Sequence, residues 1–408
     1  TDTDTDTDTD TDTDTDTDMD TDTDTDTDTD TDTDTDVDAG LDSGIDAGNG
    51  SAFAYRKQLT IDHLQVSEVE GQTLTDFPIL VRIDADSDLA AIDYLGGVQS
   101  LSGDDIVFRA QDGQTQLDHE IELYNPQSGA LVCWVRIPSL SATENTIIFI
   151  YYGNPDIGGP TETPKDVWHE TFEGVWHLND AVIDEQSDGI HKDSTAKHDG
   201  AQINNNNVEG IIADGQSFDG NGDYITMGDI DTLDGLTTLT VSGWVQLQTL
   251  NDWAPIASKM LSIDEDHYGW VLQECGPERQ DANDVLVGIR EGGHPDGVTT
   301  NDAVVVSQWF YVAMVYDGSG ATNAQRLKYF HNGDAQTLDY LFTTPSAAPS
   351  TDAEVTLAKS HSENFFIHGI IDEIRISIAA RSADWIKTSF NNQVETSTFC
   401  TVGSEEPL

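Results

Sequence analysis

The first 36 residues repeat the dipeptide Thr-Asp, interrupted only by Met19. Helix is disfavoured because threonine is β-branched, aspartate is a poor helix former, and aspartates four residues apart repel one another. Apart from Met19 the segment has no apolar side chain to bury, so it cannot build a core of its own. We therefore expect an extended segment that reaches roughly 120 Å at about 3.3 Å per residue.

Side chains alternate along an extended chain, so the aspartates would line one side and the threonine hydroxyls the other. Composition favours a disordered, self-repelling spacer. Three sharper hypotheses stay open: O-glycans on the threonines, divalent cations along the aspartates, or pairing with the edge of another molecule. Aspartates on one side lie about 6.6 Å apart, too far to chelate one calcium ion at about 2.3–2.6 Å. Cations would therefore condense along the row rather than occupy discrete sites.

We predict O-glycosylation of the evenly spaced threonine hydroxyls, which no competing fold hides. The predicted acceptors are Thr1, Thr3, Thr5, Thr7, Thr9, Thr11, Thr13, Thr15, Thr17, Thr21, Thr23, Thr25, Thr27, Thr29, Thr31, Thr33 and Thr35.

The repeat period changes in residues 37–52, where Val37, Leu41 and Ile45 each begin a four-residue unit of the pattern apolar-Asp-small-Gly. We interpret this repeat as a docking segment that sets the register of strand addition to a second copy of the chain. The alternative is a glycine-rich linker with incidental apolar residues.

The whole chain is strongly acidic, with 77 Asp and Glu against 17 Lys and Arg. Residues 1–50 hold 21 of the acidic residues and no basic one, which leaves 56 against 17, or −39, for residues 51–408. Binding to nucleic acid or to an anionic membrane surface needs a basic surface and is excluded. The sequence has no run of about 18 apolar residues, so we predict no membrane insertion. The chain begins at Thr1, and we expect a processed product or fragment of a secreted, extracellular or cell-surface protein, with any signal or anchor outside this chain.

Cys133, Cys275 and Cys400 lie far apart and show no CxxC spacing. Neither a thiol-ligated metal site nor a disulfide framework is predicted. One bridge, Cys275–Cys400, stays open for an oxidising compartment.

Residues 53–157 alternate between apolar and polar side chains in short runs separated by Gly, Asn and Asp, which is typical of a β-sandwich. The runs are 55–61, 78–83, 106–109, 119–124, 130–137 and 146–152. The stretch resembles the DUF2341 family of bacterial secreted proteins. The resemblance is carried by Tyr55-Arg56-Lys57, Phe77-Pro78-Ile79-Leu80, Gly103-Asp104-Asp105-Ile106, Leu117 with Glu120-Ile121-Glu122, Trp134-Val135, and Tyr151-Tyr152-Gly153-Asn154-Pro155. It implies little about chemistry, because the family has no assigned activity.

Residues 158–166 are a Pro/Gly linker, and residues 167–402 form a second β-rich unit before a tail at 403–408. Its marker segments are Val175-Trp176-His177-Leu178, Ser217-Phe218-Asp219-Gly220, Asp223-Tyr224-Ile225, 238–244, 308–313 and 369–376. Their order resembles the laminin-G-like, concanavalin-A-type jelly roll of bacterial surface proteins. The resemblance implies two packed antiparallel sheets and a short helical turn at 381–390. The predicted fold class is therefore all-β, with two β-sandwich (jelly-roll) domains behind an extended low-complexity N-terminal strand or stalk.

Catalytic motifs are missing from the second unit. Glucanases of this fold carry two or three carboxylates at alternating positions of one strand. Residues 167–400 contain no such motif. Glu120 and Glu122 do alternate, but they belong to the first unit, where we interpret them as a solvated strand face. HExxH, GxSxG and P-loop motifs are also absent from the sequence. We predict no catalytic residues and a protein that is not an enzyme.

Calcium is the one cofactor that the laminin-G-like resemblance implies, near the meeting of the first and last strands. Asp193, Asp372 and Glu373 would come together there, with Asp199 and the His198 carbonyl as further candidates, and hard oxygen ligands are what calcium prefers. The alternative is that Asp372 pairs with Arg375 or Arg381.

The function that we predict is a non-enzymatic extracellular structural or adhesive protein. It would be a glycosylated fibre or stalk subunit that associates with copies of itself through the Thr-Asp segment. Two alternatives stay open. One is a carbohydrate-binding surface module on a passive stalk, with Trp253, Tyr268 and Trp270 as candidate ligand-binding aromatics on a concave sheet face. The other is an accessory fragment of a glycan-active enzyme.

Overall fold

The computed structural model describes residues 53–408, except 69–70, 72, 251–252, 264–265, 276–282, 294–295, 301–303, 341, 361–364 and 395. The described residues belong to one compact unit, Asn49–Leu408. The Thr-Asp run and its predicted glycosylation sites lie outside the described residues, as do Val37, Leu41 and Ile45.

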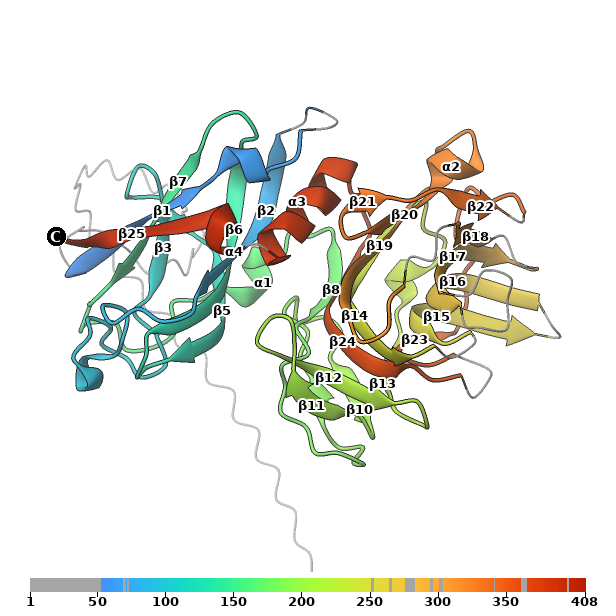
Figure 1. The fold of residues 1–408 in the computed structure, drawn as a ribbon, viewed down its shortest axis with the longest axis horizontal. Helices are drawn as coiled ribbons and strands as arrows, with labels where there is room; N and C mark the ends of the chain where they lie inside the picture. The colour runs from blue at the N-terminus through green and yellow to red at the C-terminus, as the bar shows by residue number, and fades with distance from the viewer. Residues whose placement is uncertain are drawn as a thin grey trace, which may run out of the picture. The chain divides into compact units, whose positions relative to one another are not determined.

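The first β-sandwich packs a five-stranded sheet on a three-stranded sheet (Figure 1). The larger sheet has the order β25 (Cys400–Pro407), β1 (Tyr55–Ile61), β7 (Thr146–Tyr152), β3 (Val107–Ala110) and β4 (Gln116–Leu117). The smaller sheet has the order β2 (Leu74–Ile83), β6 (Ala130–Leu140) and β5 (His119–Asn125). Alternating apolar side chains such as Leu59, Phe77 and Ile150 fill the space between the sheets. Strands β1 and β7 have the predicted bounds, and β2 and β6 run a few residues beyond theirs.

The second β-sandwich contains two larger antiparallel sheets. The nine-stranded sheet has the order β22 (Leu338–Tyr340), β18 (Asp296–Thr299), β17 (Asp284–Glu291), β16 (Asp266–Cys275), β15 (Pro255–Ile263), β23 (Glu354–Leu357), β13 (Tyr224–Asp229), β10 (Gly200–Ile203) and β9 (Ile190–His191). The eight-stranded sheet has the order β11 (Asn206–Glu209), β12 (Asp214–Asp219), β24 (His368–Ser377), β14 (Thr238–Thr249), β19 (Trp309–Asp317), β20 (Leu327–His331) and β21 (Asp334–Ala335), with β8 (Phe172–Trp176) paired to β24. The predicted all-β class with two sandwiches is confirmed.

Helices are short and lie outside the sheets. They are α1 (Pro164–Val167), α2 (Asn323–Arg326), α3 (Ala383–Val394) and α4 (Thr396–Phe399), with single 3₁₀ turns at His63–Gln65, Ile92–Tyr94 and Asp231–Leu233. Within the described ranges, no helix is long and apolar enough to cross a membrane. The helical turn expected at 381–390 corresponds to α3.

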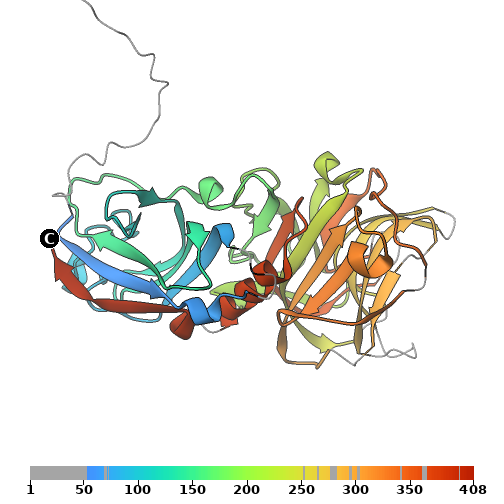
Figure 2. The same cartoon turned by 90° about the horizontal axis from the view of Figure 1, so that it is seen from above.

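The C-terminal strand returns to the first sandwich. After β24 the chain passes through α3 and α4 and then adds β25 antiparallel to β1, so that both ends of the described chain share one sheet (Figure 2). The predicted domain end at 402 and tail at 403–408 differ from this arrangement. Sequence periodicity predicts that a strand exists but not which sheet edge it joins. Without β25, strand β1 would be an exposed edge of its sheet.

Helix α3 contacts both sandwiches. The Asn392 amide accepts a hydrogen bond from Leu80 N at 2.6 Å and donates one to Leu80 O at 3.0 Å. On the other side, Trp244 Nε1 donates to Gln393 Oε1 at 2.6 Å. Trp385 packs against Phe77 with ring centroids 4.7 Å apart. The two sandwiches are therefore joined by specific contacts and not by a linker alone.

Cys400 and Cys133 are buried free thiols. Cys400 packs in the core of the first sandwich, whereas Cys275 ends β16 in the second. The Cys275–Cys400 bridge that the sequence left open is therefore not formed.

Candidate functional site

Charged side chains gather in the interior where the two sandwiches meet. This junction cluster consists of Glu120 and Glu122 from β5, His177 after β8, and Glu373 and Arg375 from β24. His177 Nδ1 lies 2.7 Å from Glu373 Oε1 and 3.6 Å from Glu122 Oε2. His177 Nε2 lies 3.3 Å from Glu120 Oε2. The side chains of Glu122 and Glu373 have no solvent exposure.

Local backbone geometry places these carboxylates. Glu120 and Glu122 are two residues apart on a strand, so they share one face of the three-stranded sheet. Glu373 lies at a β-bulge, where the pairing of β14 with β24 skips from Ser242 to Trp244, and its φ is +56°. A Cβ on the opposing Gly243 would lie only 2.4 Å from the Ile374 side chain. The bulge re-aims Glu373, and a side chain at position 243 would require the end of the Ile374 side chain to move.

The glutamates and the histidine set one another's protonation. Burial alone would lower the pKa of His177, but the charges of Glu373, Glu120 and Glu122 raise it well above its usual value. Burial would raise the pKa of Glu373 and of Glu120, but the His177 charge lowers both below the usual value, and Arg375 adds to the effect on Glu373. Burial and the Glu373 charge raise the pKa of Glu122 to about 8.

Charge in the junction cluster is balanced at neutral pH. The lowered pKa values of Glu120 and Glu373 and the raised pKa of His177 favour their charged forms, and the pKa of about 8 favours a protonated Glu122. Two tryptophans complete the packing, because Trp134 Nε1 donates to Glu122 at 2.9 Å and Trp168 Nε1 donates to Glu120 at 2.7 Å. The Arg375 guanidinium lies 4.1 Å from the Trp134 ring centroid and 4.8 Å from that of Trp168.

The junction cluster is suited to joining the domains and not to acid–base catalysis on a bound substrate. Glu122, His177 and Glu373 bring ligating atoms within 4.8 Å of one another. His177 binds a metal only as the neutral imidazole, however, and the surrounding glutamates hold it protonated. Arg375 also occupies the second oxygen of Glu373, at 2.6 Å.

A cleft of about 620 Å³ opens beside the junction cluster. Its lining residues are Arg136, Lys165, Asp166, Trp168, His169, Glu170, Phe172, Thr195 and Lys197, which come from both sandwiches and the segment between them. The lining holds three Lys or Arg against two Asp or Glu, a net charge of +1 with His169 neutral. This junction cleft has the volume of a small-molecule or oligosaccharide site.

Two family models match successive parts of the chain. Residues 102–174 match DUF2341, a domain of unknown function, and residues 219–387 match Laminin_G_3, the concanavalin A-like lectin/glucanases superfamily. The chain carries a DUF2341 domain followed by a laminin-G-like domain. No curated protein matches it.

Solved structures resemble the chain only distantly. Domain 4 of AbnA, an extracellular GH43 arabinanase from Geobacillus stearothermophilus solved with arabinotriose, is 16% identical with a TM-score of 0.40, over 54% of this chain and 98% of that one. The binding domain of Paraclostridial Mosquitocidal Protein 1 is 13% identical with a TM-score of 0.40, over 56% and 52%. A Trypanosoma rangeli sialidase is 10% identical with a TM-score of 0.40, over 68% and 45%. The chain thus spans about half the length of the latter two, and matches this distant do not assign a function.

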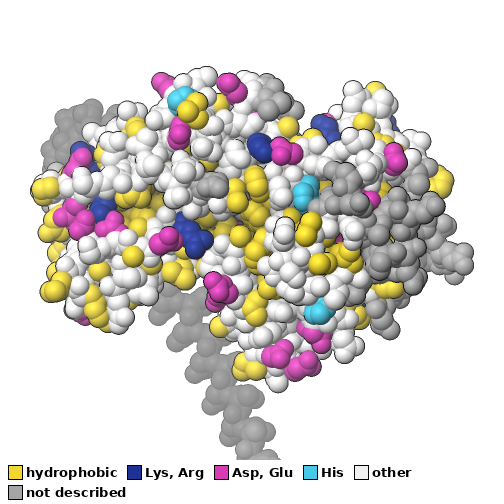
Figure 3. Space-filling view, viewed as in Figure 1, with side chains coloured by type: hydrophobic (Ala, Val, Ile, Leu, Met, Phe, Trp, Pro, Cys, Tyr) yellow, Lys and Arg dark blue, Asp and Glu magenta, His cyan; other side chains and the backbone are white. Residues whose placement is uncertain are grey.

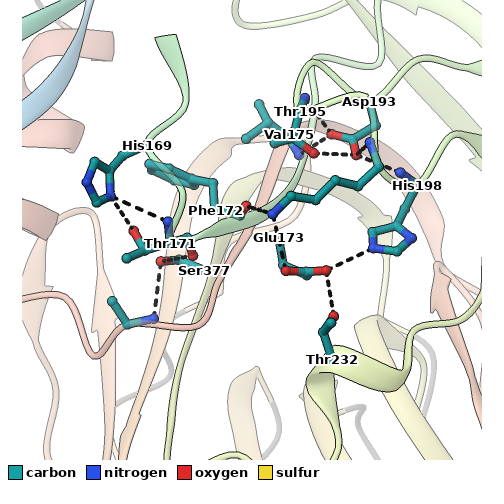
Figure 4. A network of polar contacts seen from close by, with 12 residues as sticks. His169, Thr171, Phe172, Glu173, Val175, Asp193, Thr195, His198, Thr232 and Ser377 are labelled. Atoms are coloured by element: carbon teal, nitrogen blue, oxygen red, sulfur yellow. Dashed lines mark hydrogen bonds and ion pairs between the residues drawn. The ribbon is translucent and has the colours of Figure 1, made fainter. Parts of the chain in front are cut away.

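Asp193, predicted as a calcium ligand, is instead surrounded by hydrogen-bond donors in the laminin-G-like domain (Figure 4). Its carboxylate accepts bonds from the backbone N–H groups of Val175, Thr195, Lys197 and His198 and from the Thr195 hydroxyl. Five donors at 2.6–3.1 Å fill the carboxylate and fix the 193–198 loop against β8. Asp199 bonds Lys192 at 2.6 Å, and the His198 carbonyl accepts from Trp176 Nε1 at 2.8 Å, so both are also engaged.

The other two predicted ligands lie apart from Asp193. Asp372 Oδ2 accepts hydrogen bonds from Ile211 N and Ile212 N, at 2.8 and 3.0 Å. Glu373 contacts His177 and Arg375 in the junction cluster. In the described part of the chain, no group of metal-ligating atoms includes Asp193 or Asp372. The structure thus does not bring the predicted three together.

The three predicted ligand-binding aromatics do not form an exposed platform. Trp270 is 1% exposed and packs in the core between the two sheets, so its assignment as a ligand-binding residue was wrong. Side chains alternate along β16, and Trp270 lies on the inward face. The sequence alone does not tell which of the two faces of this strand is buried. Trp253 and Tyr268 are half-buried, and Trp253 packs beside Met260 and Val271.

The interpretation of Glu120 and Glu122 as a solvated strand face was also wrong. Both carboxylates are buried because β5 faces the laminin-G-like domain, which supplies His177 and Ser194 as partners. The only sequence signal was the Glu-x-Glu spacing itself. Nothing within the DUF2341 segment shows that a second domain covers that face.

Proposed function

We propose that this chain is a non-enzymatic, lectin-like module of the extracellular surface that binds a glycan carrying carboxylate groups in the junction cleft. The laminin-G-like domain supports the lectin-like part, since its superfamily is described as lectins and glucanases. The extracellular location accords with the acidic composition of the chain.

The exposed cation Lys165 in the cleft lining is the observation that carries the proposal. Residues 51–408 have a formal charge of −39, yet the cleft lining has a net charge of +1. Arg136 pairs with Asp118 and Asp76, and Lys197 bonds Phe172 O and Glu173. Lys165 is exposed, and no ion pair of it is found among the described residues. An exposed ammonium group in the lining of a polar cleft favours an anionic ligand over a neutral one.

The non-enzymatic part rests on the placement of the tuned carboxylates. Glu122, whose raised pKa would suit a general acid, is inaccessible to any substrate in this arrangement. Asp166 and Glu170 line the cleft, so hydrolysis belongs among the outcomes to be measured. The finer prediction, a fibre subunit that self-associates through residues 1–50, rests on the sequence alone and stays a prediction.

The test is a binding screen of the full chain against paired neutral and uronic- or sialic-acid-bearing oligosaccharides, followed by calorimetry. We expect binding to the acidic members only, and Lys165→Glu should weaken it at least tenfold, because the substitution reverses the charge of a lining cation that has no ion pair among the described residues. Lys328→Glu, on the exposed face of β20, is the matched control and should bind as the parent does. Binding that ignores Lys165→Glu, or no binding to any acidic glycan, would contradict the proposal. Release of reducing ends would overturn its non-enzymatic part.

A further inference from the structure

We propose that Glu185, Asp219 and Asp223, here called the turn cluster, bind a calcium ion in the laminin-G-like domain. One carboxylate oxygen from each residue lies within 4.8 Å of the others. These residues differ from the predicted ligands Asp193, Asp372 and Glu373. The inference is also independent of the glycan-binding proposal, because none of the three lines the junction cleft.

The turn between β12 and β13 brings two of the carboxylates together. Asp219 ends β12 and Asp223 directly precedes β13. Gly220 and Gly222 have φ values of +82° and +106°, which only glycine adopts without strain, and they fold the turn tightly. Asp223 Oδ2 accepts a hydrogen bond from Asp219 N at 2.9 Å, and Asp219 Oδ1 accepts one from Asn221 N at 2.6 Å.

Glu185 comes from the loop between β8 and β9 and is held by backbone contacts. Its N–H donates to Asn204 O at 2.9 Å, and Asn204 N–H donates to Gln186 O at 2.7 Å. Glu185 has a φ of +57°, which a non-glycine residue adopts only when its surroundings impose it. The position of the third carboxylate is therefore fixed by the fold.

An unpartnered buried oxygen points to a missing ligand. Asp223 is 4% exposed, and its Oδ1 is buried without a hydrogen-bond partner. Across the described residues, none of the three carboxylates forms an ion pair with a Lys, Arg or His. In Figure 3, acidic side chains gather on the part of this domain that carries β10 and β11, and no described Lys or Arg stands beside them on that face. A buried carboxylate normally has a cation or several donors, so its counter-charge must come from solution.

The ligand chemistry selects calcium. Two oxygens that each lie about 2.3–2.6 Å from one ion are at most about 5 Å apart, which accommodates the separation of up to 4.8 Å in this cluster. All three donors are hard carboxylate oxygens, with no His or Cys to favour zinc. Glu185 and Asp219 are exposed, so an ion can enter and water can complete its coordination.

The protonation of Asp223 agrees with this geometry. Burial, followed by the charges of Asp219, Glu185 and Asp184, raises the pKa of Asp223 to about 6 in spite of the hydrogen bond from Asp219 N–H. Because the folded-state pKa of Asp223 is raised, the folded protein loses stability as pH rises from about 4 to 6. Above pH 6 the ionised cluster carries an electrostatic penalty that a bound cation removes.

The test must distinguish this site from diffuse binding by the 21 aspartates of residues 1–50. We would therefore measure the melting temperature of the full chain at pH 7 with and without calcium, and Tb³⁺ luminescence sensitised by neighbouring aromatics such as Tyr224. Residues 1–50 contain no aromatic residue to sensitise emission. At a hundredfold excess over Kd, calcium should raise the melting temperature by about 5 °C, and magnesium by less.

Three variants decide the assignment. Asp223→Asn should melt higher than the parent without calcium and should lose both the calcium shift and the Tb³⁺ signal. Glu185→Gln, at an exposed position that tolerates change, should weaken the affinity for calcium at least tenfold. Glu209→Gln, an exposed glutamate on the neighbouring β11, is the matched control and should keep the full shift. A parent whose melting temperature ignores calcium, or an Asp223→Asn variant that keeps the shift, overturns the proposal.

Discussion

The junction cluster and the turn cluster are built from the same carboxylates but differ in the origin of their counter-charge. In the junction cluster, His177 and Arg375 balance Glu120 and Glu373, and Glu122 keeps its proton. In the turn cluster, no described cation faces Glu185, Asp219 or Asp223, and the Asp223 pKa rises to about 6. The first cluster contains its own counter-charges, whereas the second needs a bound ion to supply one.

The comparison shows why a count of acidic residues does not identify a metal site. The junction cluster contains more ionisable groups at shorter distances, and it includes its own cations, His177 and Arg375. The turn cluster is smaller and partly exposed, and no described cation pairs with it. A buried carboxylate oxygen without a hydrogen-bond partner occurs in both clusters, Glu122 Oε1 in the first and Asp223 Oδ1 in the second, so the missing cation is what distinguishes the turn cluster. Removing a partner should therefore harm the first cluster, and removing a carboxylate should relieve the second.

The largest effect should come from His177→Ala, which leaves the ionised Glu120 and Glu373 buried without their shared cation. Breaking a buried ion pair by removing one member costs about 3–5 kcal/mol. Urea unfolding of the full chain at pH 7 measures the loss. The control is His63→Ala, because His63 is partly exposed and its side chain pairs with Asp62 and Asn145 among the described residues; it should cost under about 1 kcal/mol. Equal losses for the two variants would show that the junction cluster does not hold the domains together.

A smaller and pH-dependent effect should follow from Glu122→Gln. The folded-state pKa of Glu122 is raised to about 8, so the folded protein binds more protons than the unfolded chain between about pH 4.5 and 8. Stability therefore falls as pH rises through that window, by on the order of a few kcal/mol. Glutamine mimics the protonated carboxyl and can still accept the Trp134 hydrogen bond.

The expected result is a variant close to the parent at pH 5 and more stable than the parent at pH 8.5. Unfolding curves of both proteins at half-unit pH steps measure the difference. The raised pKa of His177 makes both proteins lose stability in the same direction as pH rises, so only the difference reports on Glu122. If the free energies of unfolding of the two proteins changed in parallel with pH, Glu122 would not take part in the pH dependence, and the raised pKa would be contradicted.

Local sequence predicted much of the fold because strand periodicity is a local property. The bounds of β1 and β7 and the helix after β24 followed from alternation and family resemblance. The pairing of β25 with β1 did not, because the whole second domain separates residues 61 and 400 in the sequence. Strand pairing at that separation has no local signature.

The candidate sites were less predictable, since each depends on which partner covers a side chain. The spacing of Glu120 and Glu122 suits a solvent-facing strand as well as a domain junction. Calcium was expected from the laminin-G-like resemblance, but Asp193 has five hydrogen-bond donors and Asp372 bonds two backbone amides. The Asp219–Asp223 segment was recognised as a family motif, yet the third carboxylate, Glu185, lies more than 30 residues earlier and enters only through the fold.

The smallest effect should appear in the salt dependence of stability without calcium. Exposed charges are screened by salt over a Debye length that falls from about 10 Å at 0.1 M to about 3 Å at 1 M, whereas buried pairs are screened much less. The high negative charge of the whole molecule gives every variant a common rise in stability with NaCl. Glu185→Gln should reduce that rise by a few tenths of a kcal/mol beyond the Glu209→Gln control, because Glu185 repels Asp223 directly. Glu122→Gln removes a group that is already neutral and should leave the salt response unchanged below pH 7.

Thermal melts from 0.01 to 1 M NaCl with a chelator present measure the three slopes. Equal slopes for Glu185→Gln and Glu209→Gln would mean that the turn cluster is no more repulsive than the rest of the acidic surface, and the contrast between the two clusters would then fail on its exposed side.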